Sequence, residues 1–399
     1  MKYIIRIVLI FPIMISIGCN SYSPEPVCDS GEMIMFSSPM LTVESKSTFI
    51  DAFKAGDEFG VLGYCLPYTV GTGSINYAGG SALWSNKINQ CAPLVFYKQK
   101  VTVKQSGCVY DKDGGSDNNP KYWYRNGYDI DNNENPDITE ADNYRYTFFA
   151  YYPYDDQEGK YFDIDHPTSE SEAGGPVFTF TMPQEGSDVD TPLNHKDTPD
   201  AMLAALYNRQ KSDGNLQFNF SHILTGLGFE VNNFSENDLT VYSIKLKGSF
   251  LKKLTVDLSS GTLDFTSTER YYGTYTIYDG GTSGLLLQGV LFDETSSSSP
   301  SPIGGEHLLL ISGDGGNDGL TYLGEDLTVT INYKFGNKTN SEELKRPGTF
   351  TPKPGVKYTA QLNFVGSAFV LQFVVDNSEE WDDGEAEDGN ETNDDIIFE

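Results

Sequence analysis

The sequence has little positive charge. Lys and Arg together number 27 against 57 Asp and Glu, which gives a formal net charge of −30 at pH 7. Binding to nucleic acid depends on clustered Lys and Arg that contact phosphates, so this composition argues against a nucleic acid partner. The same deficit argues against electrostatic docking on an anionic surface. Acidity of this kind favours solubility at a cell exterior.

Catalytic signatures are also missing. The chain has 4 His, none in an HExxH or HxH spacing, and His222 sits in an apolar stretch where a hydrogen-bonded core histidine is the expectation. No GxSxG motif, P-loop or strand-following GxGxxG motif occurs. Carboxylate pairs are too frequent in so acidic a chain to mark a glycosidase site. We therefore expect no enzyme and no cofactor.

One acidic loop has the ligand pattern of a calcium site. In residues 129–140, oxygen-bearing side chains stand at EF-hand positions, with Asp129, Asp131, Asn133 and Glu140 as the weakly indicated calcium ligands. However, Glu134 occupies the position that needs glycine for the sharp turn, and no amphipathic helices flank the loop. A non-EF-hand calcium loop stays open as an alternative. The expectation is an acidic, solvated loop and no metal.

Cysteine is scarce, and the chain has no CxxC pair. Besides Cys19, four cysteines precede residue 110 with spacings of 37, 26 and 17 residues: Cys28, Cys65, Cys91 and Cys108. These spacings differ from those of a zinc site, which is the rival interpretation. In an exported protein an even number of cysteines favours disulfides. We favour a Cys65–Cys91 bridge, because both residues flank a Gly/Ser/Asn-rich stretch, and leave Cys28 and Cys108 to pair or stay free.

The first twenty residues, MKYIIRIVLIFPIMISIGCN, are typical of a bacterial lipoprotein signal. Lys2 and Arg6 supply the positive charge, residues 7–17 are apolar, and Ser16-Ile17-Gly18 precede Cys19. The apolar run is shorter than the ~20 residues of a transmembrane helix. We expect a signal peptide over residues 1–18, palmitate on Cys19 and a tether over residues 19–31 at the outer membrane. A plain secretory signal with an incidental cysteine is the alternative.

The remaining composition favours β-structure. Tyr (25), Phe (24) and Gly (40) are abundant, and segments with helical periodicity are scarce. Strand patterns occur at residues 33–36, 94–103, 146–154 and 177–182. One stretch, residues 197–210 (DTPDAMLAALYNRQ), has good helix formers and is predicted to be helical.

The second half of the chain repeats the strand pattern at short intervals. Segments such as residues 216–220, 271–278, 327–335 and 357–364 are separated by turn residues, which is typical of antiparallel sandwiches. About 380 residues follow the signal, more than one hydrophobic core usually holds. We predict an N-terminal sandwich over residues 32–212 and a C-terminal sandwich over residues 213–375.

Residues 376–399 change character. They contain twelve Asp and Glu and no Lys or Arg, which is typical of a solvated tail. Four apolar residues stand out in this acidic tail: Trp381, Ile396, Ile397 and Phe398. We interpret the tail as a flexible arm with these residues as its anchors.

The order of motifs resembles the fimbrillin family, the lipoprotein pilins and pilin-like adhesins of type V pili on Gram-negative anaerobes. After the lipobox at Cys19, the motifs that carry the resemblance are residues 56–61 (GDEFGV), 148–154 (FFAYYPY), 199–204 (PDAMLA) and 216–225 (LQFNFSHILT), and then Trp381 in its acidic stretch. The resemblance implies two transthyretin-like antiparallel β-sandwich domains with little helix. It also implies assembly by strand exchange, in which a protease removes the first strand and an arm of a neighbouring subunit fills the groove.

The resemblance implies a cell-surface subunit of a fimbrium whose partners are other pilus subunits and surface receptors. Family subunits are typically cleaved after an arginine that follows the first strand, but the first arginine after Arg6 is Arg125, so Lys46 is the candidate for protease maturation. Stalk, tip and anchor roles stay open. The alternative is a monomeric outer-membrane lipoprotein that binds glycans on aromatic side chains, and a hydrolase is a third interpretation.

Overall fold

The computed structural model describes residues 33–41, 52–67, 95–110, 121–123, 144–154, 160–165, 177–257, 264–266, 269–289, 301–311, 322–323, 327–345 and 349–375. These residues form strands β1 to β23 and two short 3-10 helices, η2 (His195–Asp197) and η3 (Lys211–Asp213). Within the described part there is no α-helix. The all-β prediction is confirmed; the transthyretin-like topology stays a prediction. No described helix has the length and apolar character to cross a membrane.

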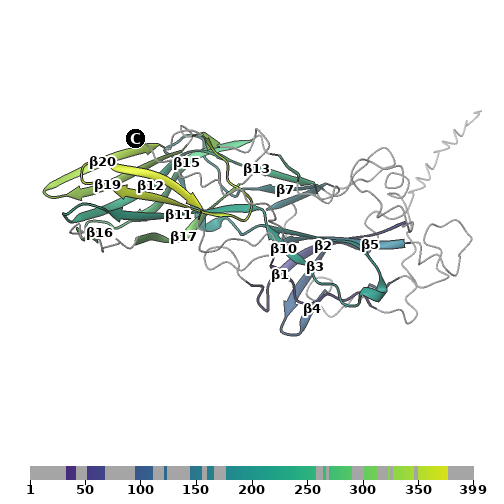
Figure 1. The fold of residues 1–399 in the computed structure, drawn as a ribbon. Coiled ribbons are helices and arrows are strands. Elements are labelled where there is room, and N and C mark those ends of the chain that lie inside the picture. The colour runs from purple at the N-terminus through teal and green to yellow at the C-terminus, as the bar shows by residue number, and fades with distance from the viewer. Residues whose placement is uncertain are drawn as a thin grey trace, which may run out of the picture.

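A seven-stranded sheet contains most of the N-terminal strands (Figure 1). Its strands, in spatial order, are β1 (Met40–Leu41), β10 (Asn219–His222), β9 (Met202–Arg209), β5 (Tyr144–Tyr152), β2 (Glu58–Pro67), β3 (Phe96–Lys104) and β4 (Gly107–Val109). All neighbours pair antiparallel except β1 and β10, which run parallel. One face of this sheet holds an aromatic core that includes Phe36, Phe59, Phe148 and Phe218.

The helix predicted over residues 197–210 is wrong. Residues 202–209 are β9, a central strand between β10 and β5, and η2 precedes it. Met202, Leu203 and Ala204 are all buried, because both faces of the strand are covered. Tertiary burial therefore overrides the helix propensity of this Ala- and Leu-rich stretch.

Two further sheets pack face to face at the other end of the molecule (Figure 1). One has the order β17 (Ser301–Ile311), β11 (Leu224–Asn233), β22 (Lys357–Phe364) and β23 (Phe369–Val375). The other has the order β20 (Lys338–Lys345), β19 (Leu327–Phe335), β12 (Leu239–Leu251), β15 (Arg270–Asp279) and β8 (Pro192–Leu193), with β16 (Leu285–Leu287) also paired to β12. A small sheet joins β18 (Tyr322–Leu323) and β21 (Thr349–Phe350).

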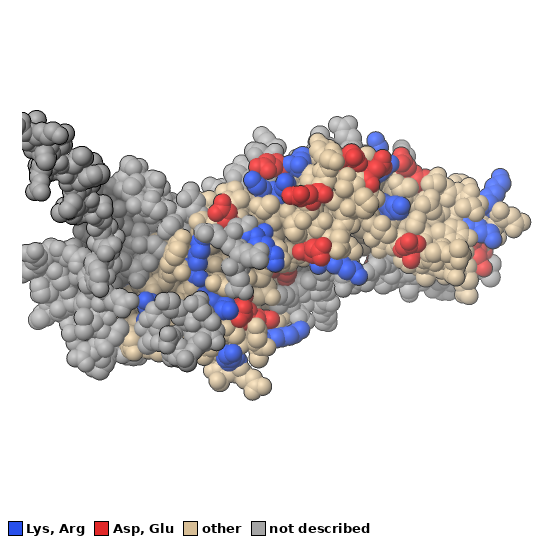
Figure 2. All heavy atoms as spheres, turned by 180° about the vertical axis from the view of Figure 1, so that it is seen from behind, with Lys and Arg blue, Asp and Glu red and all other residues tan. Residues whose placement is uncertain are grey.

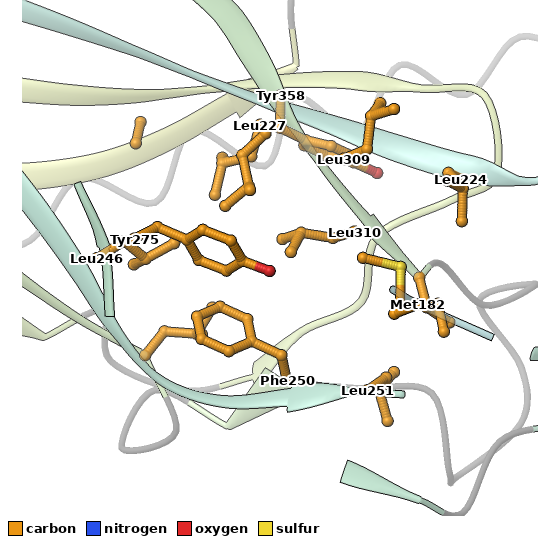
Figure 3. Close-up of a cluster of buried hydrophobic side chains, with 14 of the residues drawn as sticks. Met182, Leu224, Leu227, Leu246, Phe250, Leu251, Tyr275, Leu309, Leu310 and Tyr358 are labelled. Carbon is orange, nitrogen blue, oxygen red and sulfur yellow. The ribbon is translucent and has the colours of Figure 1, made fainter. Parts of the chain in front are cut away.

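Aromatic and aliphatic side chains fill the space between these two sheets. The ring of Tyr333 on β19 lies 5.5 Å from that of Phe364 on β22, and the Phe250 and Tyr275 rings lie 5.0 Å apart. Figure 3 shows Tyr275 pointing into a cluster with Leu227 and Leu310. The Tyr275 hydroxyl is hydrogen-bonded to that of Tyr271 at 2.7 Å, so burial of these phenols leaves them satisfied.

A four-stranded sheet joins strands from the two halves of the chain. Its order is β14 (Asp264–Thr266), β13 (Lys253–Asp257), β7 (Val177–Thr181) and β6 (Phe162–Asp165). It packs on the second face of the seven-stranded sheet, where the Tyr151 ring lies 5.5 Å from that of Phe162. Strands from both sides of residue 212 thus share sheets, and the predicted two-domain division stays a prediction.

Charged side chains are scattered over the surface. Figure 2 shows Lys and Arg interspersed with Asp and Glu on one face of the described part. Two surface ion pairs are Lys247–Glu343 at 2.5 Å and Lys253–Glu269 at 2.9 Å. Exposed pairs of this kind contribute little to stability, so the fold rests on its apolar cores.

Candidate functional site

The N-terminal segment, residues 33–41, lies between the two ends of the seven-stranded sheet. On one side, β1 pairs with β10, and an isolated parallel bridge joins Phe36 to Leu216. On the other side, the Cys108 amide of β4 donates to the Phe36 carbonyl at 3.1 Å. The segment therefore connects the β10 side of the sheet to β4 at its other end and covers the aromatic core.

Three backbone hydrogen bonds fix the segment on the β10 side. Leu216 N–H donates to the Met35 carbonyl, Ser37 N–H donates to the Leu216 carbonyl, and Met40 N–H donates to the Phe218 carbonyl, each at 2.8 Å. Leu216 thus bonds through its N–H and its carbonyl to two residues of the segment that are two positions apart, Met35 and Ser37. This is the hydrogen-bond pattern of parallel strands. This pattern fixes both the direction and the register of the segment.

On the β4 side, side chains add to the backbone contacts. Ile34 N–H donates to the Lys121 carbonyl at 2.8 Å, and the Tyr110 hydroxyl donates to the Ile34 carbonyl at 2.8 Å. The Cys108 thiol lies 3.3 Å from the Ser37 carbonyl and donates to it. We call the residues that bind the segment the seat: Phe96, Cys108, Tyr110, Lys121, Phe148, Leu216, Gln217 and Phe218.

Side chains of the segment alternate between core and solvent. Ile34 and Phe36 are 0% and 2% exposed, whereas Met35 is 36% exposed and Met40 is 53% exposed. This is the period of two expected for an extended strand with one buried face. The two inward side chains, Ile34 and Phe36, attach the segment to the core.

Phe36 is the centre of an aromatic pocket. Its ring centroid lies 5.4–6.0 Å from four others, those of Phe96, Tyr110, Phe148 and Phe218. Most of these contacts are tilted or edge-to-face, the geometries that aromatic pairs prefer. The pocket is therefore shaped for an aromatic side chain.

Burial favours the neutral forms of two groups of the seat, the Cys108 thiol and the Tyr110 hydroxyl. It raises the pKa of the Cys108 thiol to about 11 and the pKa of the Tyr110 hydroxyl to about 12. Because the thiolate is the nucleophilic form of cysteine, the raised pKa lowers the reactivity of the Cys108 thiol.

Most residues predicted from the sequence to be functional lie outside the described residues. These are Cys19, Cys28, Lys46, Cys91, Trp381, Ile396, Ile397 and Phe398, together with the calcium-loop candidates Asp129, Asp131, Asn133 and Glu140. Cys65 is part of β2, and Cys108 is a buried free thiol in β4. The Cys65–Cys91 disulfide and the calcium loop stay predictions. Within the described part, no group of three or more His, Cys, Asp or Glu is arranged to hold a metal ion.

His222 is a core residue, as the sequence predicted. It is 2% exposed, and its Nδ1 lies 2.8 Å from Oδ1 of the buried Asp200. The pair links β10, the strand that pairs with β1 of the N-terminal segment, to the chain just before β9.

The sequence predicted strands at residues 33–36 and 216–220 but not that they lie side by side. The signals for these strands are a short apolar run, MIMF, and an alternation of apolar and polar residues, LQFNF. Which strand pairs with which is a non-local property, so neither Leu216 and Phe218 nor Tyr110 was recognised as part of the site.

A family model described as fimbrillin-like matches residues 108–377. The chain belongs to the fimbrillin-like family. The resemblance read from the motifs is thereby confirmed. Membership of a fimbrillin-like family, rather than of an enzyme family, is in line with the expectation that this chain is not an enzyme.

Several solved structures are similar to this fimbrillin-like chain. A candidate cell adhesion protein from Bacteroides ovatus is 13% identical, with a TM-score of 0.44, and the match covers 87% of this chain and 97% of that one. The tip fimbrial protein Mfa3 from Porphyromonas gingivalis is 7% identical, with a TM-score of 0.34 and coverages of 86% and 98%. The fimbrial anchor protein Mfa2 from the same organism is 12% identical, with a TM-score of 0.30 and coverages of 88% and 98%. No curated protein sequence matches the chain.

Proposed function

We propose that the chain is a structural or adhesive subunit of a cell-surface fimbrium and that its subunits join by strand exchange at the seat. The observation that carries the proposal is the N-terminal segment, which is bound on both sides by hydrogen bonds and inserts two buried side chains. Family membership supports the fimbrial part of the proposal. The seat supports the exchange part.

Loss of the segment would leave an unstable seat. The N–H groups of Cys108 and Leu216 and the carbonyls of Leu216 and Phe218 would lose their partners in the segment, and the Phe36 pocket would open. Buried polar groups without partners cost about 1–3 kcal/mol each. Another extended strand restores both features, because backbone pairing supplies affinity and alternate side-chain pockets supply specificity.

The sequence offers the other parts of such a cycle. Lys46 follows β1 and is the candidate for protease maturation. The acidic tail, residues 376–399, is the proposed donor arm, with Trp381, Ile396, Ile397 and Phe398 as its anchors. The proposed partners are other pilus subunits and host or bacterial surface receptors, and the proposed attachment to the outer membrane is the Cys19 lipid.

Deletion of residues 381–399 tests this function. The truncated protein should fold and reach the cell surface, since the described strands end before the tail, but it should no longer join filaments. The measurement is the ladder of assembled subunits in gels of unboiled samples, compared with full-length protein at equal surface amount. Normal ladders from the truncated protein would contradict the donor-arm proposal.

The glycan-binding alternative predicts a different result. A monomeric glycan-binding lipoprotein would give saturable sugar binding by the monomer and no ladders.

A further inference from the structure

The end of β11 that lies away from the seven-stranded sheet carries exposed apolar side chains. Phe234, Val365 and Val370 are 42%, 54% and 44% exposed. β11 begins two residues after β10 and runs for 10 residues, so these side chains lie about 30 Å from β10, toward the other end of the molecule (Figure 1). They are therefore separate from the seat.

Strand pairing puts the three apolar side chains on one face of the sheet of β17, β11, β22 and β23. Phe234 N–H donates to the Phe364 carbonyl at 2.9 Å, which extends the parallel pairing of β11 with β22 and sets Phe234 beside Val365. Val370 is paired with Asn363, two residues before Val365. Side chains alternate between the two faces along a strand, and Phe364 points into the core, so the three apolar side chains share the outer face.

A buried amide lies on the same face. Asn232, two residues before Phe234, is paired with Asn363, and its Nδ2 donates to the Asn363 Oδ1 at 2.8 Å. Asn232 is 6% exposed, and its Oδ1 has no hydrogen-bond partner among the described residues. Because buried polar atoms nearly always have a partner, this oxygen indicates a donor that comes from a ligand.

The next row of the outer face is also polar. Glu230 is paired with Gln361, whose Nε2 lies 3.5 Å from the Glu230 Oε2, and Gln372 follows in the same row on β23. All three side chains are partly exposed. The face therefore combines an apolar surface with carboxylate and amide oxygens, which accept hydrogen bonds from hydroxyl and N–H groups.

The turn that carries Phe234 is held in place by its neighbour. Asn233 Nδ2 donates to the carbonyls of Asn237 and Leu287 at 2.9 and 3.2 Å. The Asn233 Oδ1 accepts from the N–H and the hydroxyl of Ser235 at 3.1 and 2.6 Å. The Phe234 ring is thus presented on a fixed backbone, and a preorganised surface loses little conformational entropy when a ligand binds.

We propose that this face binds a glycan that contains an N-acetylated amino sugar. The acetamide N–H donates to the Asn232 Oδ1, and the acetamide methyl group contacts Val365 and Val370. The C–H face of the sugar ring lies on the Phe234 ring, and sugar hydroxyls donate to Glu230. This inference rests on the adhesive role in the proposed function and is independent of strand exchange.

The size of the apolar surface favours a sugar over a protein partner. A stable protein–protein interface takes about 20–30 residues from each partner. Three exposed apolar side chains around one buried amide instead suit a small ligand, because small-ligand sites combine apolar contacts with a few well-placed polar groups.

The test compares two disaccharides by isothermal titration calorimetry on the full chain. N,N′-diacetylchitobiose should bind saturably. Cellobiose has the same linkage with hydroxyls in place of the acetamides, and it should bind at least about tenfold more weakly, since a site that hydrogen-bonds a ligand N–H rejects an analogue without it. Equal affinity for the two sugars, or no saturable binding of the first, overturns the proposal.

Three variants locate the site. Phe234→Ala should lower the affinity for N,N′-diacetylchitobiose at least about tenfold, and Asn232→Ala should abolish the preference over cellobiose. Tyr272→Ala is the matched control for Phe234→Ala, because Tyr272 is 43% exposed on a strand of another sheet, and it should change the affinity less than about twofold. Circular dichroism checks folding. If Asn232→Ala does not fold, the two sugars and the Phe234→Ala comparison still decide.

The remaining outcomes separate this site from other interpretations. Equal effects of Phe234→Ala and Tyr272→Ala overturn the proposal. So does self-association of the chain that Phe234→Ala abolishes without any sugar binding, which would make the face a contact between copies. Phe234→Ala should leave the ladders of assembled subunits unchanged, so ladders report on strand exchange and calorimetry reports on this site.

Discussion

At the scale of single residues, Phe36 does the most to attach the N-terminal segment. Its ring contacts aromatic residues from β3, β5 and the chain before β10, so it joins parts of the sheet that are distant in sequence. Met35, its neighbour, points outward and is 36% exposed. The two positions therefore differ in burial although they are adjacent in the strand.

Replacing Phe36 with alanine should lower the free energy of unfolding by about 3–5 kcal/mol, the usual cost of removing a buried phenylalanine ring from a packed core. The measurement is urea-induced unfolding of the full chain. Met35→Ala is the matched control and should change the value by less than about 0.5 kcal/mol. Equal effects of the two substitutions would contradict the described burial of this segment.

The protonated thiol of Cys108 predicts a loss of stability at alkaline pH. Its pKa is raised by burial from 9.0 to about 11, so between these values the unfolded chain loses a proton that the folded chain keeps. This contribution to stability is complete below pH 9 and is lost as the pH rises toward 11. Melting temperatures at pH 8 and pH 10.5 should differ less in Cys108→Ser than in the parent. An unchanged difference would mean that the thiol is not shielded.

At the scale of elements, the N-terminal segment acts as a closing strand that is held on both edges. The segment should therefore stay bound after the chain is cut between residues 42 and 51, and Cys108 should stay protected. A chain that lacks residues 33–41 should instead expose Cys108. Maleimide labelling at pH 7 measures this, with rapid labelling of the deleted chain and slow labelling of the cut chain as the expected result. Rapid labelling of the uncut parent would show that the segment does not cover the thiol.

Some elements could be predicted from the sequence and others could not, for physical reasons that differ from element to element. The strands predicted at residues 327–335 and 357–364 coincide with β19 and β22, because alternating β-branched and aromatic residues bounded by turns specify a strand locally. The helix predicted over residues 197–210 failed, because Met202, Leu203 and Ala204 are good helix formers but occupy the middle of a sheet. The seat could not be predicted, because it depends on Phe36 and Leu216 meeting across the fold.

At the scale of the whole molecule, strands from the two halves of the chain share one core. Leu62 and Phe149 of the seven-stranded sheet belong to the same cluster of buried residues as Leu246 and Leu362 of the two packed sheets. The aromatic core under the N-terminal segment is a separate cluster. Opening the seat therefore exposes the aromatic core and leaves the larger core covered. A subunit that exchanges a strand without unfolding requires this separation.

The proposed lipid attachment predicts how the whole molecule is anchored. Replacing Cys19 with alanine should abolish palmitate labelling and leave the signal uncleaved by the lipoprotein peptidase, since the thiol at the lipobox cysteine is the acceptor of the lipid. The measurement is metabolic labelling with palmitate, with Cys28→Ala as the control that should label normally. Unchanged labelling of Cys19→Ala would contradict the lipid attachment.

The central claim is that the N-terminal segment is replaced at the seat when subunits assemble. The most direct measurement is mass spectrometry of purified filaments combined with maleimide labelling of Cys108 in the intact filament. Assembled subunits should lack residues 33–41, and Cys108 should nevertheless be protected, because a strand from another copy covers it. Filaments whose subunits retain residues 33–41, or whose Cys108 labels as rapidly as in the deleted chain, would contradict the account.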